Sequence, residues 1–330
     1  TTGTVTLTSV NDTAANLVNL AAIDNSEVNM ASTSITVTDA VSLAQANTLN
    51  GYTTGTVTLT SVSDTVANIT SINEISNSEV TMASASITVT DAAGTPITAA
   101  NLSVIGGATT GAVTVNNAVN ITGNHDELIS ALYTSDTKVY LGGGENDASV
   151  IINDADGVAI TASELSAIGG QTNSTVILSN AVNISGTTDQ LIAALITTST
   201  KVTASTANIN FTDTPTDSQF EAIDAVTTGT IALPTNGNNF TVTDTSISAG
   251  TLISLNNQYS GIVDASAVTT ITGTAAEITT VYSASGITSL GDESVTVTDA
   301  VTKANADTIN AYTTGQVTLT SVSDTVANIT

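Results

Sequence analysis

Two kinds of short alternating segment recur along the chain. One reads Thr-Val-Thr-Leu-Thr at 4–8 and 56–60, with a close copy at 316–320. The other reads Ser-Ile-Thr-Val-Thr-Asp-Ala at 34–40 and 86–92 and has looser relatives further along. Because an aliphatic residue alternates with Thr or Ser, each segment has the period-2 pattern of a strand with one buried face. Thr and Val also favour strands, since a branched Cβ fits a pleated sheet.

A different pattern follows most of these strands and predicts short helices. A Thr or Asn is followed after two residues by Asn, Glu or Gln, and then by an aliphatic residue, as in Thr-Val-Ala-Asn-Ile at 65–69. This spacing is a capping box or a variant of it, in which the first side chain accepts a hydrogen bond from the N3 amide. Each cap stabilises its helix by about 1 kcal/mol. We expect helices to begin at Thr65, Asn124, Thr161, Thr187, Thr216 and Thr274.

The apolar residue after each box is expected to mark one repeat and to face the core. Successive markers are about 28 residues apart on average. A second apolar residue three or four positions later completes an apolar stripe on the helix, as Ile72 does for Ile69. The markers are Leu17, Leu49, Ile69, Leu102, Leu128, Leu165, Leu191, Phe220, Leu252, Ile278, Ile309 and Ile329.

These patterns predict a β-rich α/β solenoid built from stacked repeats. Each repeat of about 28 residues should contain a strand, a tight turn and a short capped helix, which Gly or Thr-Thr-Gly then ends. One repeat cannot bury its own apolar edge, so neighbouring repeats must cover one another. An all-β parallel β-helix is the alternative.

The repeats are expected to form a single continuous array over residues 1–330, with two alternating repeat families. No Pro-rich or Ser-rich linker interrupts them. The phrase at 53–70 returns at 313–330 with one change, which suggests a window on a longer array.

Composition narrows the classes of function. The chain has 29 acidic residues, three Lys and no Arg, which gives a formal net charge of −26. It would repel the phosphates of nucleic acids and the surface of anionic membranes. No apolar run approaches the ~18 residues of a membrane-spanning helix. The absence of Cys excludes disulfides and thiolate metal sites, and suits an extracellular bacterial protein stabilised by repetition.

Two acidic stretches are candidates for calcium binding. Asp147 lies in the glycine-rich stretch 142–150, which partly matches the calcium-binding nonapeptide of secreted β-rolls. Asp154 and Asp156 begin a sequence similar to the first half of an EF-hand loop, although Glu164 stands one position out of register for the bidentate ligand. The repeat alignment offers a second interpretation, in which both stretches are turns at the ends of strands. No other cofactor is expected.

His125 and Asp126 are candidates for acid–base chemistry, but the alignment favours a surface position for His125 near the start of a helix. Lyases and pectinases with solenoid folds need Arg or Lys beside carboxylates, and no Arg is present. We therefore expect no enzymatic activity. Thr-rich strands also resemble those of ice-binding β-solenoids, yet Asn and Asp interrupt the pattern in many strands.

The phrase Ser-Asp-Thr-Val-Ala-Asn-Ile at 63–69, followed by Ser-Ile-Thr-Val-Thr-Asp-Ala at 86–92, resembles repeats of giant secreted and cell-surface proteins of bacteria. The sequence is similar in particular to swimming-motility-type surface proteins of marine cyanobacteria. This resemblance implies an extracellular or cell-surface protein that builds a filament, surface layer or stalk by self-association. The rival expectation is a calcium-dependent adhesin segment that binds carbohydrate or ice.

Overall fold

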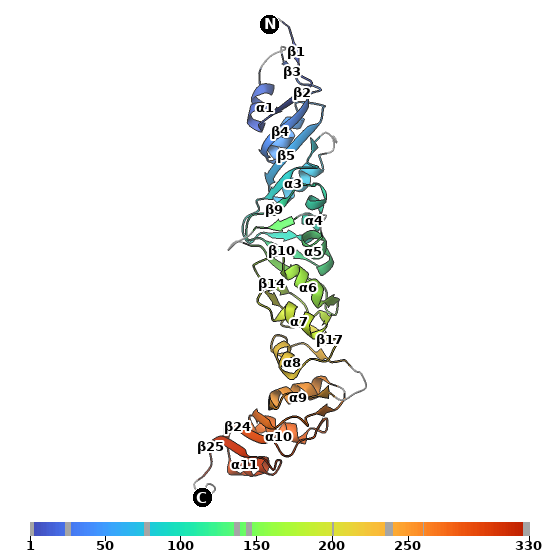
Figure 1. The fold of residues 1–330 in the computed structure, drawn as a ribbon. Coiled ribbons are helices and arrows are strands. Elements are labelled where there is room, and N and C mark those ends of the chain that lie inside the picture. Colours follow the sequence, from blue (N-terminus) through green and yellow to red (C-terminus); the bar gives the residue numbers. More distant parts are fainter. Residues whose placement is uncertain are drawn as a thin grey trace. The chain divides into compact units, whose positions relative to one another are not determined.

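The computed structural model shows an α/β protein in which strands and short helices alternate along the chain (Figure 1). It describes residues 3–23, 28–75, 80–134, 139–142, 147–199, 201–234, 240–259 and 261–325. All strand pairs among these residues are parallel. The predicted α/β class is confirmed, and the all-β alternative is wrong because helices recur throughout the described residues.

Every described helix is short, with eight to ten residues. None of the helices in the described ranges is long and apolar enough to cross a membrane. The helices are α1 (Ala14–Ala21), α2 (Leu43–Asn50), α3 (Val66–Asn73), α4 (Ala99–Gly107), α5 (His125–Leu132), α6 (Ala162–Gly169), α7 (Thr188–Leu195), α8 (Asp217–Asp224), α9 (Ala249–Gln258), α10 (Ala275–Ser283) and α11 (Lys303–Asn310).

The helices begin where the capping pattern predicts. The side chain of the residue before the helix accepts a hydrogen bond from the N3 amide at Thr65, Asn124, Thr187, Thr216 and Thr274. Helix α6 begins directly after Thr161. Ser42, Ser248 and Thr302 also cap helices and were not predicted, although Ser42 forms a full box with Gln45. A search for Thr or Asn alone therefore misses the Ser caps.

The predicted markers form the helical side of the core. Each marker from Leu17 to Ile309 has an exposure of 0%, whereas Ile329 lies outside the described residues. Strand residues supply the other side, as Ile35 and Val37 do with the same full burial. The core of each repeat therefore lies between its helix and its strands, which is where the two periodicities place the apolar residues.

Contacts divide the chain into two compact units, whose ranges interleave in the sequence. The first comprises residues 1–155, 163–180 and 197–203, and the second comprises residues 156–162, 181–196 and 204–330. The expectation of one continuous array over 1–330 stays a prediction.

The strands of the first unit form three parallel sheets, with the orders β1-β3, β11-β9-β7-β5-β4-β2 (β6 also pairs with β5) and β16-β14-β12-β10-β8. Their bounds are β1 (Val5–Thr6), β2 (Ser9–Asp12), β3 (Val28–Asn29), β4 (Ser34–Val41), β5 (Val57–Asp64), β6 (Val80–Thr81), β7 (Ser86–Val89), β8 (Pro96–Thr98), β9 (Val113–Val115), β10 (Asn120–Gly123), β11 (Val139–Leu141), β12 (Ser149–Ile152), β14 (Val176–Leu178) and β16 (Val202–Thr203).

The strands of the second unit also form three parallel sheets, with the orders β13-β15-β17-β18, β19-β21-β23 and β20-β22-β24-β25. Their bounds are β13 (Ala159–Thr161), β15 (Asn183–Gly186), β17 (Asn208–Phe211), β18 (Ile231–Ala232), β19 (Phe240–Thr241), β20 (Ser246–Ser248), β21 (Val263–Asp264), β22 (Thr270–Gly273), β23 (Ile287–Thr288), β24 (Ser294–Val301) and β25 (Val317–Val322).

We define a repeat as one helix with the strands that precede it. The sequence predicted one strand per repeat, but most helices follow two or three strand segments; α5, for example, follows β9 and β10. Strand pairing joins each repeat to the next, and one ladder aligns Val62 with Ile87 and Ile87 with Val113. A slip of one residue would turn every buried side chain of a strand outward, so burial fixes this register.

A single sheet does not take the same strand from every repeat. In the sheet β8-β10-β12-β14-β16, strands β8 and β10 directly precede their helices, whereas β14 and β16 are the first strands of theirs. In the long strand β4 two ladders meet, and the register with β5 shifts between Val37 and Ala40. The same irregularity lies between Val297 and Ala300 in β24. A bulge of this kind bends a strand and redirects its side chains.

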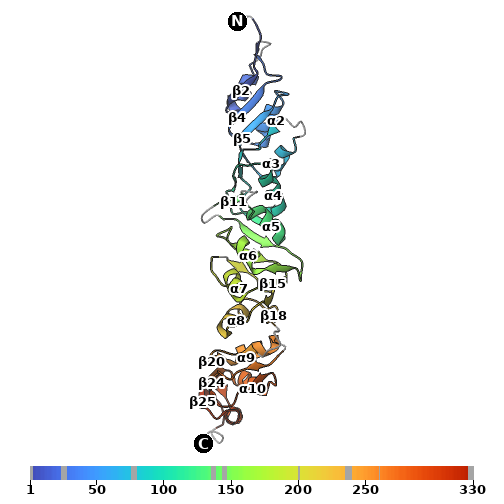
Figure 2. The same ribbon diagram turned by 45° about the vertical axis from the view of Figure 1, so that its right-hand side comes forward.

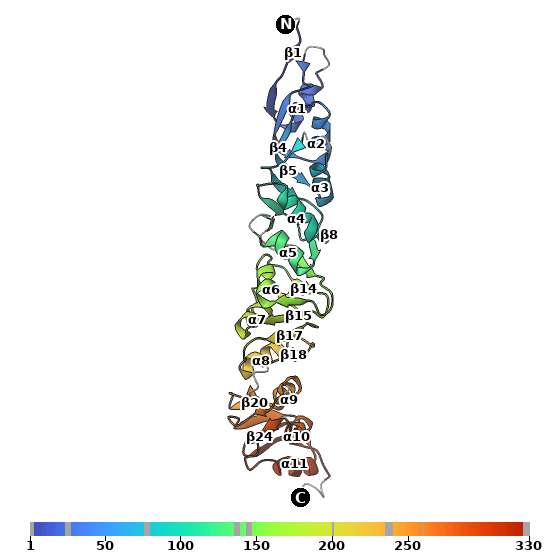
Figure 3. The same ribbon diagram turned by 90° about the vertical axis from the view of Figure 1, so that its right-hand side faces the viewer.

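Within each unit the helices lie beside the strands. In Figure 2, α2, α3, α4 and α5 follow one another along one side, and β2, β4, β5 and β11 lie along the other. In Figure 3, α9, α10 and α11 of the second unit lie beside β20 and β24. Adjacent helices pack against each other from α1 to α5, between α7 and α8, and from α9 to α11.

Candidate functional site

Wherever the Thr-Thr-Gly turn occurs, it forms a hydrogen bond between its own repeat and the preceding repeat. The Thr53 hydroxyl donates to the Thr33 carbonyl oxygen at 2.7 Å and accepts from the Gly55 amide at 2.8 Å. Thr53 is buried, so its hydroxyl satisfies two polar backbone groups away from water. The same pair of bonds recurs in the turns at 109–111, 227–229 and 313–315.

The glycine of this turn lies where two repeats approach each other closely. A Cβ on Gly55 would stand 2.5 Å from the Thr33 carbonyl oxygen, and a Cβ on Gly111 would stand 2.2 Å from that of Ala85. The sequence suggested that the turn ends a helix. The structure gives it a second role, because the turn also holds the preceding repeat.

A carboxylate of one repeat caps the helix of the preceding repeat. Asp91 accepts a hydrogen bond at 2.7 Å from the amide of Val66, the first residue of α3. This amide has no partner within its own helix, and negative charge is favoured at a helix N-terminus. The same contact, at 2.6 to 2.9 Å, joins Asp39 to Ala14, Asp64 to Leu43, Asp154 to His125, Asp213 to Thr188, Asp299 to Ala275 and Asp324 to Lys303.

A second type of junction uses Gly in place of this Asp. Gly123 faces Ala99, the first residue of α4, and a Cβ on Gly123 would stand 2.8 Å from the Ala99 Cβ. The same arrangement pairs Gly186 with Ala162 and Gly273 with Ala249. Strands β10, β15 and β22, which end in Gly, therefore make a junction without a carboxylate.

The junction hydrogen bonds change the titration of Asp64. Burial raises the pKa of this carboxyl, but hydrogen bonds from the Leu43 amide, the Asn68 side chain and the Thr65 amide lower it more. The resulting pKa lies below the ordinary value of 3.8. Asp64 therefore binds its proton less tightly in the folded protein than in the unfolded chain.

Of the three Asp residues predicted to bind calcium, Asp154 belongs to a junction. It is 6% exposed, and its Oδ2 accepts from the His125 amide at 2.8 Å. Asp156 is exposed, and its Oδ1 accepts from the Ala181 amide at 2.9 Å. Among the described residues, no group of three or more His, Cys, Asp or Glu side chains is arranged to hold a metal ion. The calcium site stays a prediction.

Asp147, the third candidate, is 5% exposed and holds a turn of the following repeat. Its Oδ2 accepts from the main-chain amide of Asn173 at 2.8 Å and from the Asn173 side chain at 2.7 Å. The other carboxylate oxygen of Asp147, Oδ1, is buried without a hydrogen-bond partner among the described atoms. Residues 143–146 of the same glycine-rich stretch lie outside the described residues.

The surface position expected for His125 is wrong. Its side chain is only 12% exposed, and its Nδ1 lies 2.8 Å from Asp154 Oδ1. Its Nε2 lies 3.5 Å from Asp126, whose side chain is 85% exposed. His125 is the first residue of α5, where the next repeat covers it. The histidine therefore adds a side-chain contact to an Asp junction.

Asp217 departs from the junction pattern. It is itself the first residue of α8, and its Oδ2 accepts from the amides of Thr243 and Asp244 in the following repeat. Burial raises the pKa of this carboxyl above its ordinary value, and the charges of Asp244 and Glu221 add to the effect. Its Oδ1 is buried without a partner among the described atoms. This junction therefore carries an unfavourable buried charge.

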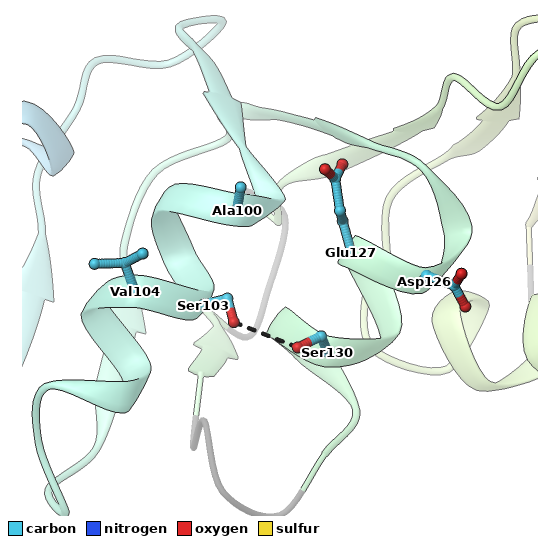
Figure 4. A pocket seen from close by; sticks show the side chains of 6 residues that line it. All are labelled: Ala100, Ser103, Val104, Asp126, Glu127 and Ser130. Atoms are coloured by element: carbon cyan, nitrogen blue, oxygen red, sulfur yellow. Dashed lines mark hydrogen bonds between the residues drawn. The ribbon is translucent and has the colours of Figure 1, made fainter.

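One hollow of about 530 Å³ lies on the surface between α4 and α5 (Figure 4). The hydroxyl oxygens of Ser103 and Ser130 lie 3.4 Å apart at its centre. Glu127 is already engaged, since its carboxylate accepts from the Asn124 amide in the capping box. The hollow is lined by Ala100, Ser103, Val104, Asp126, Glu127 and Ser130. None of these residues is a base paired with a nucleophile, so the hollow is a groove between two neighbouring helices.

Sequence reasoning missed the role of the junction carboxylates. Asp39, Asp91 and Asp299 occupy one position of the Ser-x-Thr-Val-Thr-Asp-Ala phrase, so their recurrence was visible. Their partner was not visible, because the accepted amide lies 24 or 25 residues earlier in the chain.

No protein-family model matches the chain, and no curated protein matches it.

Proposed function

We propose that this chain is a structural repeat protein whose stacked repeats form a solenoid within an extracellular filament, surface layer or stalk. The contacts between repeats support this proposal most strongly. Seven junctions place a carboxylate of one repeat on the helix amide of the preceding one. A helix whose cap lies in the next repeat is complete only when the repeats stack.

The mechanism is mechanical. Each junction adds a few hydrogen bonds and apolar contacts, so that the strength of an array grows with the number of repeats. The net charge of −26 keeps neighbouring arrays apart at low ionic strength, and salt or divalent cations reduce that repulsion.

The resemblance to giant bacterial surface proteins supports a location outside the cell. The acidic composition and the absence of Cys agree with this placement. Function then depends on repeats and their junctions rather than on a reactive centre, and no catalytic role is proposed for His125 or Asp126.

Electron microscopy and light scattering of the purified chain test the proposal. We expect elongated particles, whose mean length increases with protein concentration and with salt. Compact, monodisperse globules at every concentration and salt level would refute the structural function.

A calcium-dependent adhesin segment is the second candidate, and the partnerless Oδ1 of Asp147 favours it. Calcium should then raise the melting temperature well above the effect of Na⁺ at matched ionic strength. The variant Asp147→Asn should lose that increment, whereas Asp126→Asn, at an exposed position, should retain it. An equal response of all three proteins to calcium would exclude this site.

A further inference from the structure

The second unit contains two stacked tyrosine rings that join neighbouring repeats. Tyr282 lies near the end of α10, and Tyr312 follows α11. Their ring centroids are 5.1 Å apart, and the ring planes differ by only 7°. Both side chains are half-buried. The other aromatic pair among the described residues, Phe240 and Tyr259, meets edge to face at 62°. The tyrosine pair is therefore set apart by its parallel geometry.

Two tyrosine rings in this arrangement are suited to covalent coupling. A tyrosine that loses one electron and its phenolic proton becomes a radical, with unpaired electron density on the carbons ortho to the oxygen. Two such radicals form a carbon–carbon bond between these carbons, which gives dityrosine. A folded chain that holds both rings face to face makes this encounter unimolecular and raises its effective concentration. The stack thus supplies the proximity that the reaction needs.

A buried carboxylate lies against one of the two hydroxyls. The Tyr282 hydroxyl donates to Glu293 Oε2 at 2.7 Å, and Glu293 is 1% exposed. The Gly291 amide donates to the same carboxylate, at 2.9 and 3.0 Å from its two oxygens. Burial and the hydrogen bond to Glu293 raise the pKa of Tyr282 above its ordinary value of 10.0. The hydroxyl therefore keeps its proton at neutral pH, and Glu293 lies in place to accept that proton when the ring is oxidised.

The turn itself does not require a carboxylate at this position. Glu293 is the residue whose carbonyl oxygen accepts from the turn hydroxyl of Thr313. A buried carboxylate is unfavourable unless it is hydrogen-bonded, whereas a small side chain carries no such cost. In the other turns of this kind the same position is held by Thr33, Ala85, Ala148 and Ala207.

Tyr52 provides an internal comparison. Like Tyr312, it follows a helix and directly precedes a Thr-Thr-Gly turn. Tyr52 is also half-buried, although further repeats follow it in the chain. When the helices are aligned at their caps, Ala21 takes the place of Tyr282, and Thr33 takes the place of the carboxylate. One tyrosine is therefore common to both repeats, whereas the second ring and the carboxylate occur together only beside Tyr312.

From these observations we propose that Tyr282 and Tyr312 are an oxidative cross-linking site, at which a one-electron oxidant joins the repeats of α10 and α11 through dityrosine. The oxidant is hydrogen peroxide activated by a haem peroxidase. Each ring gives up one electron and its phenolic proton, and the proton of Tyr282 passes to Glu293 before it leaves for the solvent. After coupling, the hydrogens on the two bonded carbons move to the oxygens and restore both hydroxyls. Two tyrosines and one hydrogen peroxide thus give one dityrosine and two water molecules.

The bond would fasten two neighbouring repeats to each other. It closes the chain between Tyr282 and Tyr312 into a loop, which limits the conformations of the unfolded state and so raises the melting temperature. This inference depends on the ring pair and not on the proposed function. The bond forms within one molecule, so its result is independent of the particle lengthening that tests the structural function.

Oxidation of the full chain with a haem peroxidase and hydrogen peroxide tests the site. Digestion at Asp and Glu, followed by mass spectrometry, identifies the joined peptides by their loss of two hydrogens. We expect about tenfold more of the link between Tyr282 and Tyr312 than of any other tyrosine pair, at a yield that does not change with protein concentration. Reaction governed by exposure alone would instead favour Tyr133 and Tyr140, each 58% exposed. Links confined to those two residues would overturn the proposal.

Three variants sharpen the test. Tyr312→Phe retains an aromatic ring and should abolish the link, whereas Tyr52→Phe, the matched control, should give the natural yield. Glu293→Gln removes the proton acceptor at nearly constant volume and should slow the initial formation of dityrosine about tenfold or more. Near-ultraviolet circular dichroism reports whether the ring stack persists in that variant. An unchanged rate with an intact stack would overturn the proton transfer, and a natural yield from Tyr312→Phe would overturn the site however Glu293→Gln folds.

Discussion

Residues 53–64 and 313–324 differ only in having Thr56 or Gln316 at the fourth position, yet their surroundings differ greatly. Towards the preceding repeat they make the same contacts, including the Thr–Gly turn and the Asp cap. Towards the following side, Val62 is fully buried and Val322 is 45% exposed. The comparison shows that the contacts with the preceding repeat are built into the phrase itself, whereas the burial of Val62 depends on its pairing with the following strand β7.

The largest expected difference between residues 53–64 and 313–324 is in the burial of Val62 and Val322. Val62→Asp should lower the free energy of unfolding by roughly 4 kcal/mol or more, because it places an unpaired charge in the core. Val322→Asp should change it by less than about 0.5 kcal/mol, since the side chain is already near water. Urea denaturation followed by circular dichroism measures both. Equal losses would mean that Val322 is as well covered as Val62.

Substitution of the turn glycines tests the contacts that residues 53–64 and 313–324 both make with the preceding repeat. Gly55→Ala and Gly315→Ala should each cost about 1–3 kcal/mol, since the new Cβ meets a carbonyl oxygen of the preceding repeat. Gly107→Ala is the matched control, because a Cβ there meets no atom within 4 Å. A large loss for Gly55→Ala alone would show that residues 313–324 do not dock on their preceding repeat. Thermal melting of the three variants distinguishes these results.

The next variant tests one helix cap that a following repeat supplies. Asp91→Ala removes the acceptor that the following repeat supplies to the Val66 amide, and should cost about 1 kcal/mol. Hydrogen exchange should be faster in α3 than in the natural protein, whereas α5 should be unaffected. Asp126→Ala, at an exposed side chain of α5, should leave exchange in α3 unchanged. Unchanged exchange in α3 would remove Asp91 from the junction.

The smallest expected effect is a dependence on pH. The pKa of Asp64 is lowered on folding, so its contribution to stability is present above the unfolded pKa of about 3.9 and is lost as the pH falls through the folded pKa. Asp64→Asn should therefore show a shallower loss of stability below about pH 4 than the natural protein. Chemical denaturation between pH 2 and 6 measures the two slopes. Identical slopes would contradict a hydrogen-bonded carboxylate at this junction.

Local chemistry made the helices predictable from the sequence. A cap such as Thr65 and the marker Ile69 lie within five residues of each other, and a helix turn brings such residues together without help from the rest of the chain. Strand alternation was equally readable, since the side-chain period of a strand is two. These features gave the α/β class and the buried markers.

The junctions could not be predicted in the same way. The partner of Asp91 lies 25 residues earlier, and the partner of Thr53 lies 20 residues earlier. A carboxylate at the end of a strand is equally consistent with a solvated turn, a calcium ligand or a helix cap. His125 shows the same limit, because its neighbours in sequence gave no sign that Asp154 covers it.

The sequence by itself determined which residues form strands and helices and which of their faces are apolar, because those choices depend on neighbours within a few residues. Only the tertiary structure decided which repeat covers which, since that depends on backbone groups brought together across 20 to 30 residues of chain. The two nearly identical phrases show the difference most directly. Both phrases form a strand, and Val62 is buried because β7 pairs with the strand that contains it.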